Sequence, residues 1–144
     1  MFEKALDFLA IGDITTDAFI RLKDANVHCK LDHEDCQLCM RFGDKVPYEF
    51  VEEVRAVGNS ANAAVSAARL GLSAGLMADI GGDQNGQLCV AELKKNRVST
   101  KYVSTHHENK TNYHYVLWFE DERTILVKHE HFAYKFEAPA RLPR

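Results

Sequence analysis

The sequence predicts an α/β fold with a parallel sheet, and three observations point to it. Two short apolar runs, Asp7–Gly12 and Leu76–Ile80, are each closed by glycine and aspartate. An alanine-rich segment of helical character lies between them. All eight glycines lie at or before Gly86, and the chain beyond is rich in aromatic, histidine and β-branched residues, which favours strands. A helix between two apolar strands is typical of a βαβ unit.

The first half of the chain contains one clear strand and two segments that are harder to assign. Asp7–Gly12 suits a buried strand of a parallel sheet. Ala18–Lys30 alternates only loosely, as in a half-exposed strand pair or an extended loop. Tyr48–Val57 has apolar positions that fit a helical stripe, but a strand leading into Gly58 fits equally well.

The clearest helix is Ala61–Leu70, which is dense in alanine. Asn59 and Ser60 precede it as candidate N-caps, and Gly71 follows at the position where helices commonly end. These signals predict both ends of the helix.

The remaining elements follow in order. Leu76–Ile80 predicts a second buried strand, and Gln87–Asn96 predicts an amphipathic helix with lysines in its last turn. Asn112–Phe119 and Thr124–Glu130 are β-rich runs on either side of the polar segment Glu120–Arg123. This arrangement predicts a β-hairpin.

Composition excludes several classes of protein. The chain has 144 residues, of which 46% are hydrophobic and 27% charged, with a net charge of −3. Length and composition suit a globular domain and exclude fibrous, disordered and miniature proteins. The apolar run Tyr115–Phe119 is too short to cross a membrane, and charges interrupt Met1–Ala10 where a signal peptide is apolar. We therefore expect a cytoplasmic protein that binds a small molecule, with no nucleic acid or membrane as partner.

The cysteines pose a separate question. Without an export signal, Cys29, Cys36, Cys39 and Cys89 are expected to be reduced thiols. The pair Cys36 and Cys39, with Cys29 nearby, has a spacing that suits zinc, but no second pair completes a standard site. A zinc-binding regulator is thus a less favoured alternative, and no metal ligand is assigned.

The turn Val57–Asn62 is the strongest candidate for a binding site. A glycine-led turn at a helix N-terminus offers backbone N–H groups, and Asn59 and Asn62 add side chains that both donate and accept hydrogen bonds. Such groups suit a hydroxyl-rich ligand. The alternative is that Asn59 only caps the helix.

Three ordered motifs resemble a known family. GNSANAAVSAARLG, the downstream IGGDQNG and the opening IGDITTDAFI are similar to the N-terminal half of the ribokinase-like (PfkB) carbohydrate kinases. The resemblance implies a ribokinase-like fold, with a partial parallel-sheet αβα sandwich and a small β-sheet lid. It implies that residues 1–144 are the N-terminal part of a kinase domain, with lid segments at about 14–55 and 112–130.

The resemblance also implies the substrate-binding residues. Asp17 falls where the family's aspartate binds sugar hydroxyl groups, and Thr15 lies two residues before it on the same side. Gly58, Asn59 and Asn62 match the glycine-asparagine set that lines the sugar pocket. The chain departs from the family by having Val57 where a second glycine is common.

The implied activity is ATP-dependent phosphorylation of a sugar or nucleoside hydroxyl group. The family's catalytic aspartate belongs to a later Gly-Ala-Gly-Asp motif, and this chain has no glycine after Gly86. No catalytic residue is therefore assigned, the C-terminal ATP-binding and catalytic half is expected to be absent, and the chain alone is expected to be inactive. ATP and Mg²⁺ are the cofactors expected of the complete enzyme, neither binding strongly to this chain. A homodimer through the lid is expected, and a non-catalytic sugar-binding or dimerising module is the alternative.

Two further features are interpreted as structural. The spacing Gly81 to Gly86 resembles a phosphate loop, but Gln87 replaces the essential lysine, so a tight strand-to-helix turn with Asp83 as a cap is preferred. The histidines of the last third of the chain are expected to be exposed lid residues rather than metal ligands; they are His106, His107, His114, His129 and His131.

Overall fold

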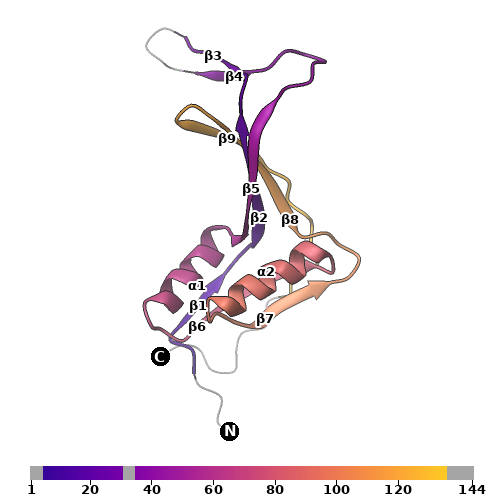
Figure 1. Ribbon diagram of the computed structural model, residues 1–144. Coiled ribbons are helices and arrows are strands. Elements are labelled where there is room, and N and C mark those ends of the chain that lie inside the picture. The colour runs from indigo at the N-terminus through magenta and orange to yellow at the C-terminus, as the bar shows by residue number, and fades with distance from the viewer. Residues whose placement is uncertain (1–4, 31–34, 136–144) are drawn as a thin grey trace. The chain divides into compact units, whose positions relative to one another are not determined.

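The computed structural model describes residues 5–30 and 35–135 (Figure 1). The elements are β1 (Phe8–Ile11), β2 (Thr15–Leu22), β3 (Asn26–His28), β4 (Gln37–Cys39), β5 (Tyr48–Val57), α1 (Asn59–Arg69), β6 (Ala74–Gly81), α2 (Gln84–Lys95), β7 (Ser99–His106), β8 (Asn112–Phe119) and β9 (Glu122–Leu126). They form two compact units. The first contains the described residues up to 16, residues 54–113 and those from 128 on, and the second contains residues 17–53 and 114–127.

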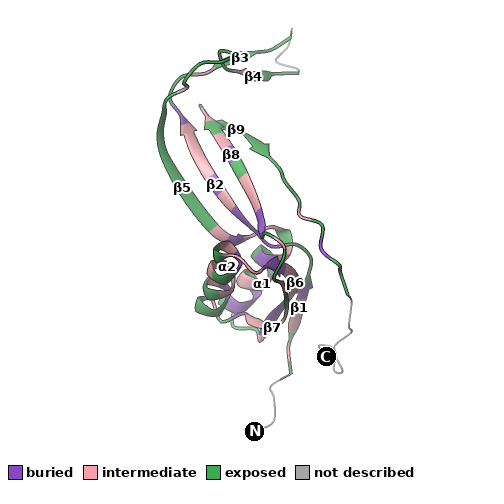
Figure 2. Cartoon of the chain, turned by 90° about the vertical axis from the view of Figure 1, so that its right-hand side faces the viewer, coloured by how far each residue is buried: buried purple, intermediate pink, exposed green. Residues whose placement is uncertain are grey.

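The first unit is an α/β layer with a parallel sheet. Its strand order is β1-β6-β7, and both neighbouring pairs run parallel, with Phe8 opposite Ala74 and Gly75 opposite Ser99. Helices α1 and α2 lie on the same face of this sheet (Figures 1 and 2). Two crossovers that advance in one direction along a sheet place their helices on one face, because such connections have a fixed hand. The predicted α/β fold is confirmed.

Helix α1 packs on the sheet through alanines, which allow helix and sheet to approach closely. Ala61 and Ala64 are fully buried in a core that includes Leu76 of β6 and Leu93 of α2. Gly71 has a φ of 95°, the left-handed conformation that ends many helices. The predicted helix is confirmed, although it begins two residues earlier than expected.

Helix α2 begins at the cap that the sequence predicts. The carboxylate of Asp83 accepts a hydrogen bond of 3.0 Å from the backbone N–H of Gly86. Lys94 and Lys95 lie in the last turn, where positive charge favours the helix dipole. The helix begins at Gln84, three residues before the predicted start, because the cap and not the apolar pattern fixes its first turn.

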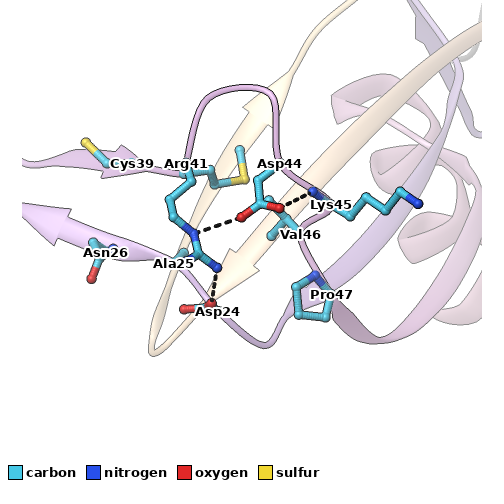
Figure 3. Close-up of a pocket in the computed structure, with 10 residues that line it drawn as sticks. Asp24, Ala25, Asn26, Cys39, Arg41, Asp44, Lys45, Val46 and Pro47 are labelled. Atoms are coloured by element: carbon cyan, nitrogen blue, oxygen red, sulfur yellow. Dashed lines mark hydrogen bonds and ion pairs between the residues drawn. The ribbon is translucent and has the colours of Figure 1, made fainter.

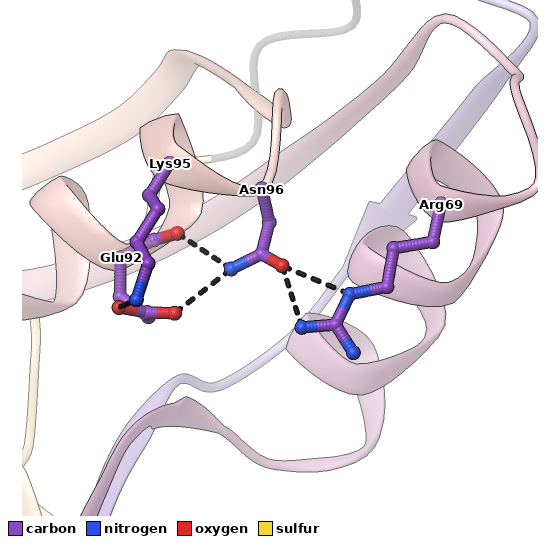
Figure 4. Close-up of polar contacts among 4 residues, drawn as sticks. All are labelled: Arg69, Glu92, Lys95 and Asn96. Carbon is purple, nitrogen blue, oxygen red and sulfur yellow. Dashed lines mark hydrogen bonds and ion pairs between the residues drawn. The ribbon is translucent and has the colours of Figure 1, made fainter.

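A polar cluster joins the C-terminal ends of the two helices (Figure 4). Arg69 of α1 donates two hydrogen bonds, of 2.9 and 2.7 Å, to the carboxamide oxygen of Asn96. The Asn96 amide in turn donates to the backbone carbonyl and the carboxylate of Glu92, both at 2.9 Å. Asn96 is thus the C-cap of α2, and its side chain also links α2 to α1 through Arg69.

The second unit is built on a sheet with the strand order β5-β2-β8-β9. The predicted hairpin is present, with Tyr115 opposite Leu126 and Phe119 opposite Glu122. The ambiguous segment Tyr48–Val57 is a strand, β5. Most of β5 and all of β9 are exposed, as Figure 2 shows in green.

The last strand is shorter than predicted. β9 ends at Leu126, whereas the sequence predicts a strand to Glu130. The backbone N–H of Glu130 donates instead to the side chain of Asn112, at 2.8 Å, and residues from 128 on belong to the first unit. After Leu126 the chain leaves the hairpin, because a hydrogen bond to the Asn112 side chain takes the place of backbone hydrogen bonds between strands.

The expectation that all cysteines are reduced thiols is wrong for two of them. Strands β3 and β4 pair antiparallel, with His28 opposite Gln37, so the residues just beyond that pair, Cys29 and Cys36, face each other. The structure joins them by a disulfide, with their Cα atoms 4.0 Å apart. Cys39 and Cys89 are free thiols. The hairpin, which the sequence does not reveal, brings the pair together.

No helix in the described part of the chain is long and apolar enough to cross a membrane.

Candidate functional site

The turn before α1 lies against the connection between β1 and β2. Gly58 has a φ of 106°, and a Cβ atom there would lie 3.1 Å from the carbonyl oxygen of Asp13. The Ser60 hydroxyl donates a 2.7 Å hydrogen bond to the same carbonyl. Conformation and close contact both require glycine at position 58, so the turn holds the N-terminus of α1 against the end of β1.

Four of the five predicted substrate-binding residues gather around this helix N-terminus. A Cβ atom on Gly58 would lie 3.9 Å from the methyl group of Thr15, so these two residues are neighbours. Asn59 and Asn62 lie on the first turn of α1 and are exposed. Thr15 itself is buried, and its hydroxyl donates to the backbone carbonyl of Thr16 at 3.2 Å.

The alternative that Asn59 only caps the helix is wrong. The N-cap position is occupied by Gly58, and no side chain makes a capping hydrogen bond. Ser60 tethers the turn through Asp13 instead. The exposed carboxamide of Asn59 is therefore not required to begin the helix.

Asp17, the fifth predicted residue, lies on β2 in the second unit. Its carboxylate oxygen Oδ1 lies 3.3 Å from Nδ1 of His114 on the neighbouring strand β8. Burial raises the pKa of Asp17, while the charge and hydrogen bonding of His114 lower it, and burial prevails. The carboxylate is thus partly desolvated and held by one imidazole.

His114 is a residue whose role the sequence prediction missed. Its side chain is only 14% exposed, so the expectation of an exposed lid histidine is wrong at this position. The alternation of β8 places His114 on the same face as Val116, which is buried. Only the pairing of β8 beside β2 identifies its partner, and no local signal carries that information.

His106 also departs from the expectation of exposed histidines. Its Nε2 lies 2.6 Å from Oδ1 of Asp79 on the adjacent strand β6, and its ring packs against Phe132 with centroids 5.1 Å apart. Nearby, Tyr134 donates a 3.3 Å hydrogen bond to Asp13. These contacts attach the segment after β9 to the carboxyl end of the parallel sheet.

The glycines after β6 do not form a phosphate loop. The backbone N–H of Gly81 donates to the Thr111 hydroxyl at 3.1 Å, that of Gly82 to His106, and that of Gly86 to Asp83. A Cβ atom on Gly81 would overlap the backbone of residues 109–111. Because these donors are engaged and the space is filled, the turn is structural, and these residues do not fit ATP phosphates.

No group of three or more His, Cys, Asp or Glu side chains among the described residues is arranged to hold a metal ion. Two of the three clustered cysteines are bonded to each other.

A hollow of about 140 Å³ in the second unit also offers little for binding (Figure 3). Arg41 bridges its two acidic residues, with Nε 2.9 Å from Asp44 and Nη2 3.7 Å from Asp24. The backbone N–H of Lys45 also donates to Asp44, at 2.8 Å. Both carboxylates of this hollow therefore already have a cationic partner in Arg41.

Solved structures with the same fold define a class of protein. The chain aligns with a protein from Agrobacterium tumefaciens assigned as a ribokinase, at 18% identity and a TM-score of 0.72, over 96% of this chain and 40% of that one. It aligns with Halothermothrix orenii fructokinase at 21% identity and a TM-score of 0.63, over 86% and 38% of the two chains. Cryptococcus neoformans ribokinase in complex with ADP aligns at 22% identity and a TM-score of 0.62, over 84% and 33%. The fold is that of the ribokinase-like sugar kinases.

The sequence defines the family more directly. The model of the pfkB family carbohydrate kinases matches residues 24–140, which is most of the chain. The chain belongs to the pfkB family of carbohydrate kinases. It spans between 33% and 40% of the length of the three solved structures named above. A comparison with curated proteins finds no match.

Proposed function

We propose that this chain supplies the substrate-binding half and the lid of a kinase that transfers the γ-phosphoryl group of ATP to a hydroxyl group of a sugar or nucleoside. The observation that carries the proposal is the pfkB family match over residues 24–140. Similar structures include a fructokinase, a ribokinase with ADP and an archaeal nucleoside kinase. We therefore propose a sugar or a nucleoside as the substrate.

The residues proposed to bind the substrate are Thr15, Asp17, Gly58, Asn59 and Asn62. Thr15 and Asp17 precede the matched segment, so their roles rest on the resemblance of the motif around them. A carboxylate accepts hydrogen bonds from hydroxyl groups, and a carboxamide both donates and accepts. The exposure of Asn59 and Asn62 at a helix N-terminus supports this role, because neither is needed as a cap.

ATP and Mg²⁺ are proposed to act only in the complete enzyme. ATP would supply the phosphoryl group, and in the glycine turn between β6 and α2 the backbone N–H groups of Gly81, Gly82 and Gly86 already have acceptors within the protein. This chain's own residues would hold the accepting hydroxyl group, and exclusion of water from it would favour its phosphorylation over hydrolysis. Alone, the chain is expected to bind substrate and form no ADP.

A calorimetric titration of the chain with D-ribose, D-fructose and adenosine tests the proposal. We expect one of these ligands to bind, and Asn62→Ala to weaken that binding by about tenfold, the effect of losing one or two hydrogen bonds. Asn85→Ala, a matched change on the first turn of α2, should leave the affinity unchanged. No binding by the folded protein, or equal losses in both variants, would contradict the proposal.

The alternative is a non-catalytic sugar-binding or dimerising module. A sugar-binding module would also bind a ligand in the calorimetric titration. The two are separated by reading the coding DNA beyond Arg144. A Gly-Ala-Gly-Asp segment downstream supports the kinase, and a stop codon followed by intergenic sequence supports the module.

The second unit is also proposed to pair with a second copy of the chain. Its sheet exposes large apolar side chains, and two of them, Tyr115 and Leu126, lie opposite each other on one face. Apolar patches of this kind mark interaction sites on soluble proteins. A cytoplasmic homodimer formed through this sheet is the arrangement we propose.

A further inference from the structure

His114 lies opposite Asp17 on one face of the second unit's sheet, and two contacts fix this arrangement. Nδ1 of His114 lies 3.3 Å from Asp17, and four residues further along both strands the guanidinium of Arg21 lies 4.4 Å from the Trp118 ring centre. Residues four apart on a strand share a face. The two contacts therefore repeat along β2 and β8. In both, a side chain of β2 meets a side chain of the neighbouring strand β8 on the same face of the sheet.

The other charged groups on this face belong to different interactions. Arg21 donates a 2.7 Å hydrogen bond to the carbonyl of Glu120 in addition to its contact with Trp118. Arg123 lies opposite Trp118 in the hairpin, at the far end of β8 from His114. On β5, Phe50 packs against Trp118, and alternation places Glu52 on the same face, where it is exposed. Burial raises the pKa of Asp17, and His114 is the neighbouring group that lowers it.

The pair has a clear chemical consequence. Burial favours the protonated carboxylic acid, and the imidazole opposes it by favouring the carboxylate. A carboxylate is an acceptor only, so it takes hydrogen bonds from neutral hydroxyl groups and repels anions.

We infer that His114 is a positioning residue that holds the Asp17 carboxylate in place on the face of the sheet, so that the site selects an uncharged hydroxyl group over a carboxylate or phosphate group of the substrate. The inference rests on the proposed function for the identity of the site, and it adds the partner of Asp17 and the charge of the group bound there.

The direct test does not need a ligand. A ¹³C NMR titration of the Asp17 carboxyl group in the full chain gives its pKa in the wild type and in three variants. His114→Ala should raise the pKa of Asp17 above the wild-type value. His114→Asn, whose amide keeps a donor near the Nδ1 position, should restore part of the difference, and His28→Ala, an exposed histidine of β3, should change nothing.

Ligand titrations at neutral pH supply the second arm. With whichever of D-ribose, D-fructose or adenosine binds the wild type, His114→Ala should weaken binding by about tenfold, because Asp17 loses the contact that orients it. His114→Asn should lose less, and D-gluconate should not bind the wild type.

The two arms separate the two hypotheses. An Asp17 pKa that is the same in the wild type and in folded His114→Ala overturns the role of His114, as does tight binding of gluconate. If none of the neutral ligands binds while the pKa moves as expected, the proposed substrate class fails and the pairing stands. If His114→Ala does not fold, the pKa of Asp17 is compared between the wild type and His114→Asn. A higher pKa in His114→Asn supports the role of His114, and an unchanged pKa overturns it.

Discussion

Asp17 is a carboxylate whose burial opposes its charge. Because its pKa is raised above the ordinary value of 3.8, the folded protein releases this proton less readily than the unfolded chain. The stability that the protonated form contributes is present below pH 3.8 and is lost as pH rises through the folded-state pKa. At neutral pH the ionised side chain is therefore a cost to folding.

Asp17→Asn should accordingly stabilise the protein at neutral pH, by on the order of 1 kcal/mol, as substitutions at strained functional sites often do. Urea unfolding at a series of pH values measures the effect. The gain should vanish as pH falls below the ordinary carboxyl pKa. A variant that is less stable than the wild type at neutral pH would show that the pairing with His114 outweighs burial.

Asp83 behaves in the opposite sense. Burial alone would raise its pKa, but hydrogen bonds from the Thr111 hydroxyl at 2.6 Å and from the backbone N–H groups of Gly86 and Thr111 outweigh burial and lower it. The stability this carboxylate contributes is present above its ordinary pKa and is lost as pH falls through the lowered folded-state pKa.

Asp83→Ala should cost about 1 to 3 kcal/mol at neutral pH, because it removes a helix cap and leaves the Thr111 hydroxyl without its acceptor. The deficit should shrink in acid. Asp121→Ala, in the exposed turn after β8, is the matched control and should be neutral. Equal effects in the two variants would contradict the role of Asp83 as a cap.

At the scale of elements, the glycine turn between β6 and α2 is closely packed against the segment that follows β7. A Cβ atom on Gly86 would overlap the carbonyl oxygen of Gly81 and lie 2.8 Å from the Thr111 hydroxyl. Gly86→Ala should therefore destabilise the protein by about 1 to 3 kcal/mol, although alanine is the better helix former. Thermal unfolding measures the loss, and Asn85→Ala, one residue earlier in the same turn, should show little effect.

The hairpin of β3 and β4 predicts a distinct order of thiol reactivity. Cys89 is fully buried and burial raises the pKa of its thiol, whereas Cys39 is partly exposed. Iodoacetamide should modify Cys39 in the folded protein, Cys89 only after denaturation, and Cys29 and Cys36 only after reduction. Mass spectrometry of peptides reads the result. Labelling of Cys29 in the folded, unreduced protein would contradict the disulfide.

Elements with local signals could be predicted from the sequence, and those set by distant contacts could not. The cap at Asp83 and the ending of α1 at Gly71 are local, and both are confirmed. The apolar spacing of β5 fits a helix as well as a strand, and only its pairing with β2 decides. The disulfide and the partners of His106 and His114 depend on strand register, which the sequence pattern does not specify.

At the scale of the whole molecule, the candidate site was predictable only through the family motifs. Composition and periodicity indicate the α/β class, but they do not distinguish Asp17 from any other carboxylate on a strand. The motif around Gly58 is recognisable in the sequence because its left-handed glycine and close contact with Asp13 are requirements of backbone geometry. His114 escaped prediction because it lies outside those motifs.

The exposed sheet of the second unit predicts self-association of the chain. Tyr115 and Leu126 lie opposite each other on β8 and β9 and are 48% and 50% exposed, so they share one face. Burying a leucine side chain contributes about 1.5 to 3 kcal/mol, and about 1.4 kcal/mol changes an equilibrium tenfold. Leu126→Lys should therefore weaken association by at least about tenfold. Sedimentation velocity over a range of concentrations measures the dissociation constant, and Leu70→Lys, at a leucine 84% exposed at the end of α1, is the control. A monomeric wild type, or equal weakening by both lysines, would contradict pairing through this sheet.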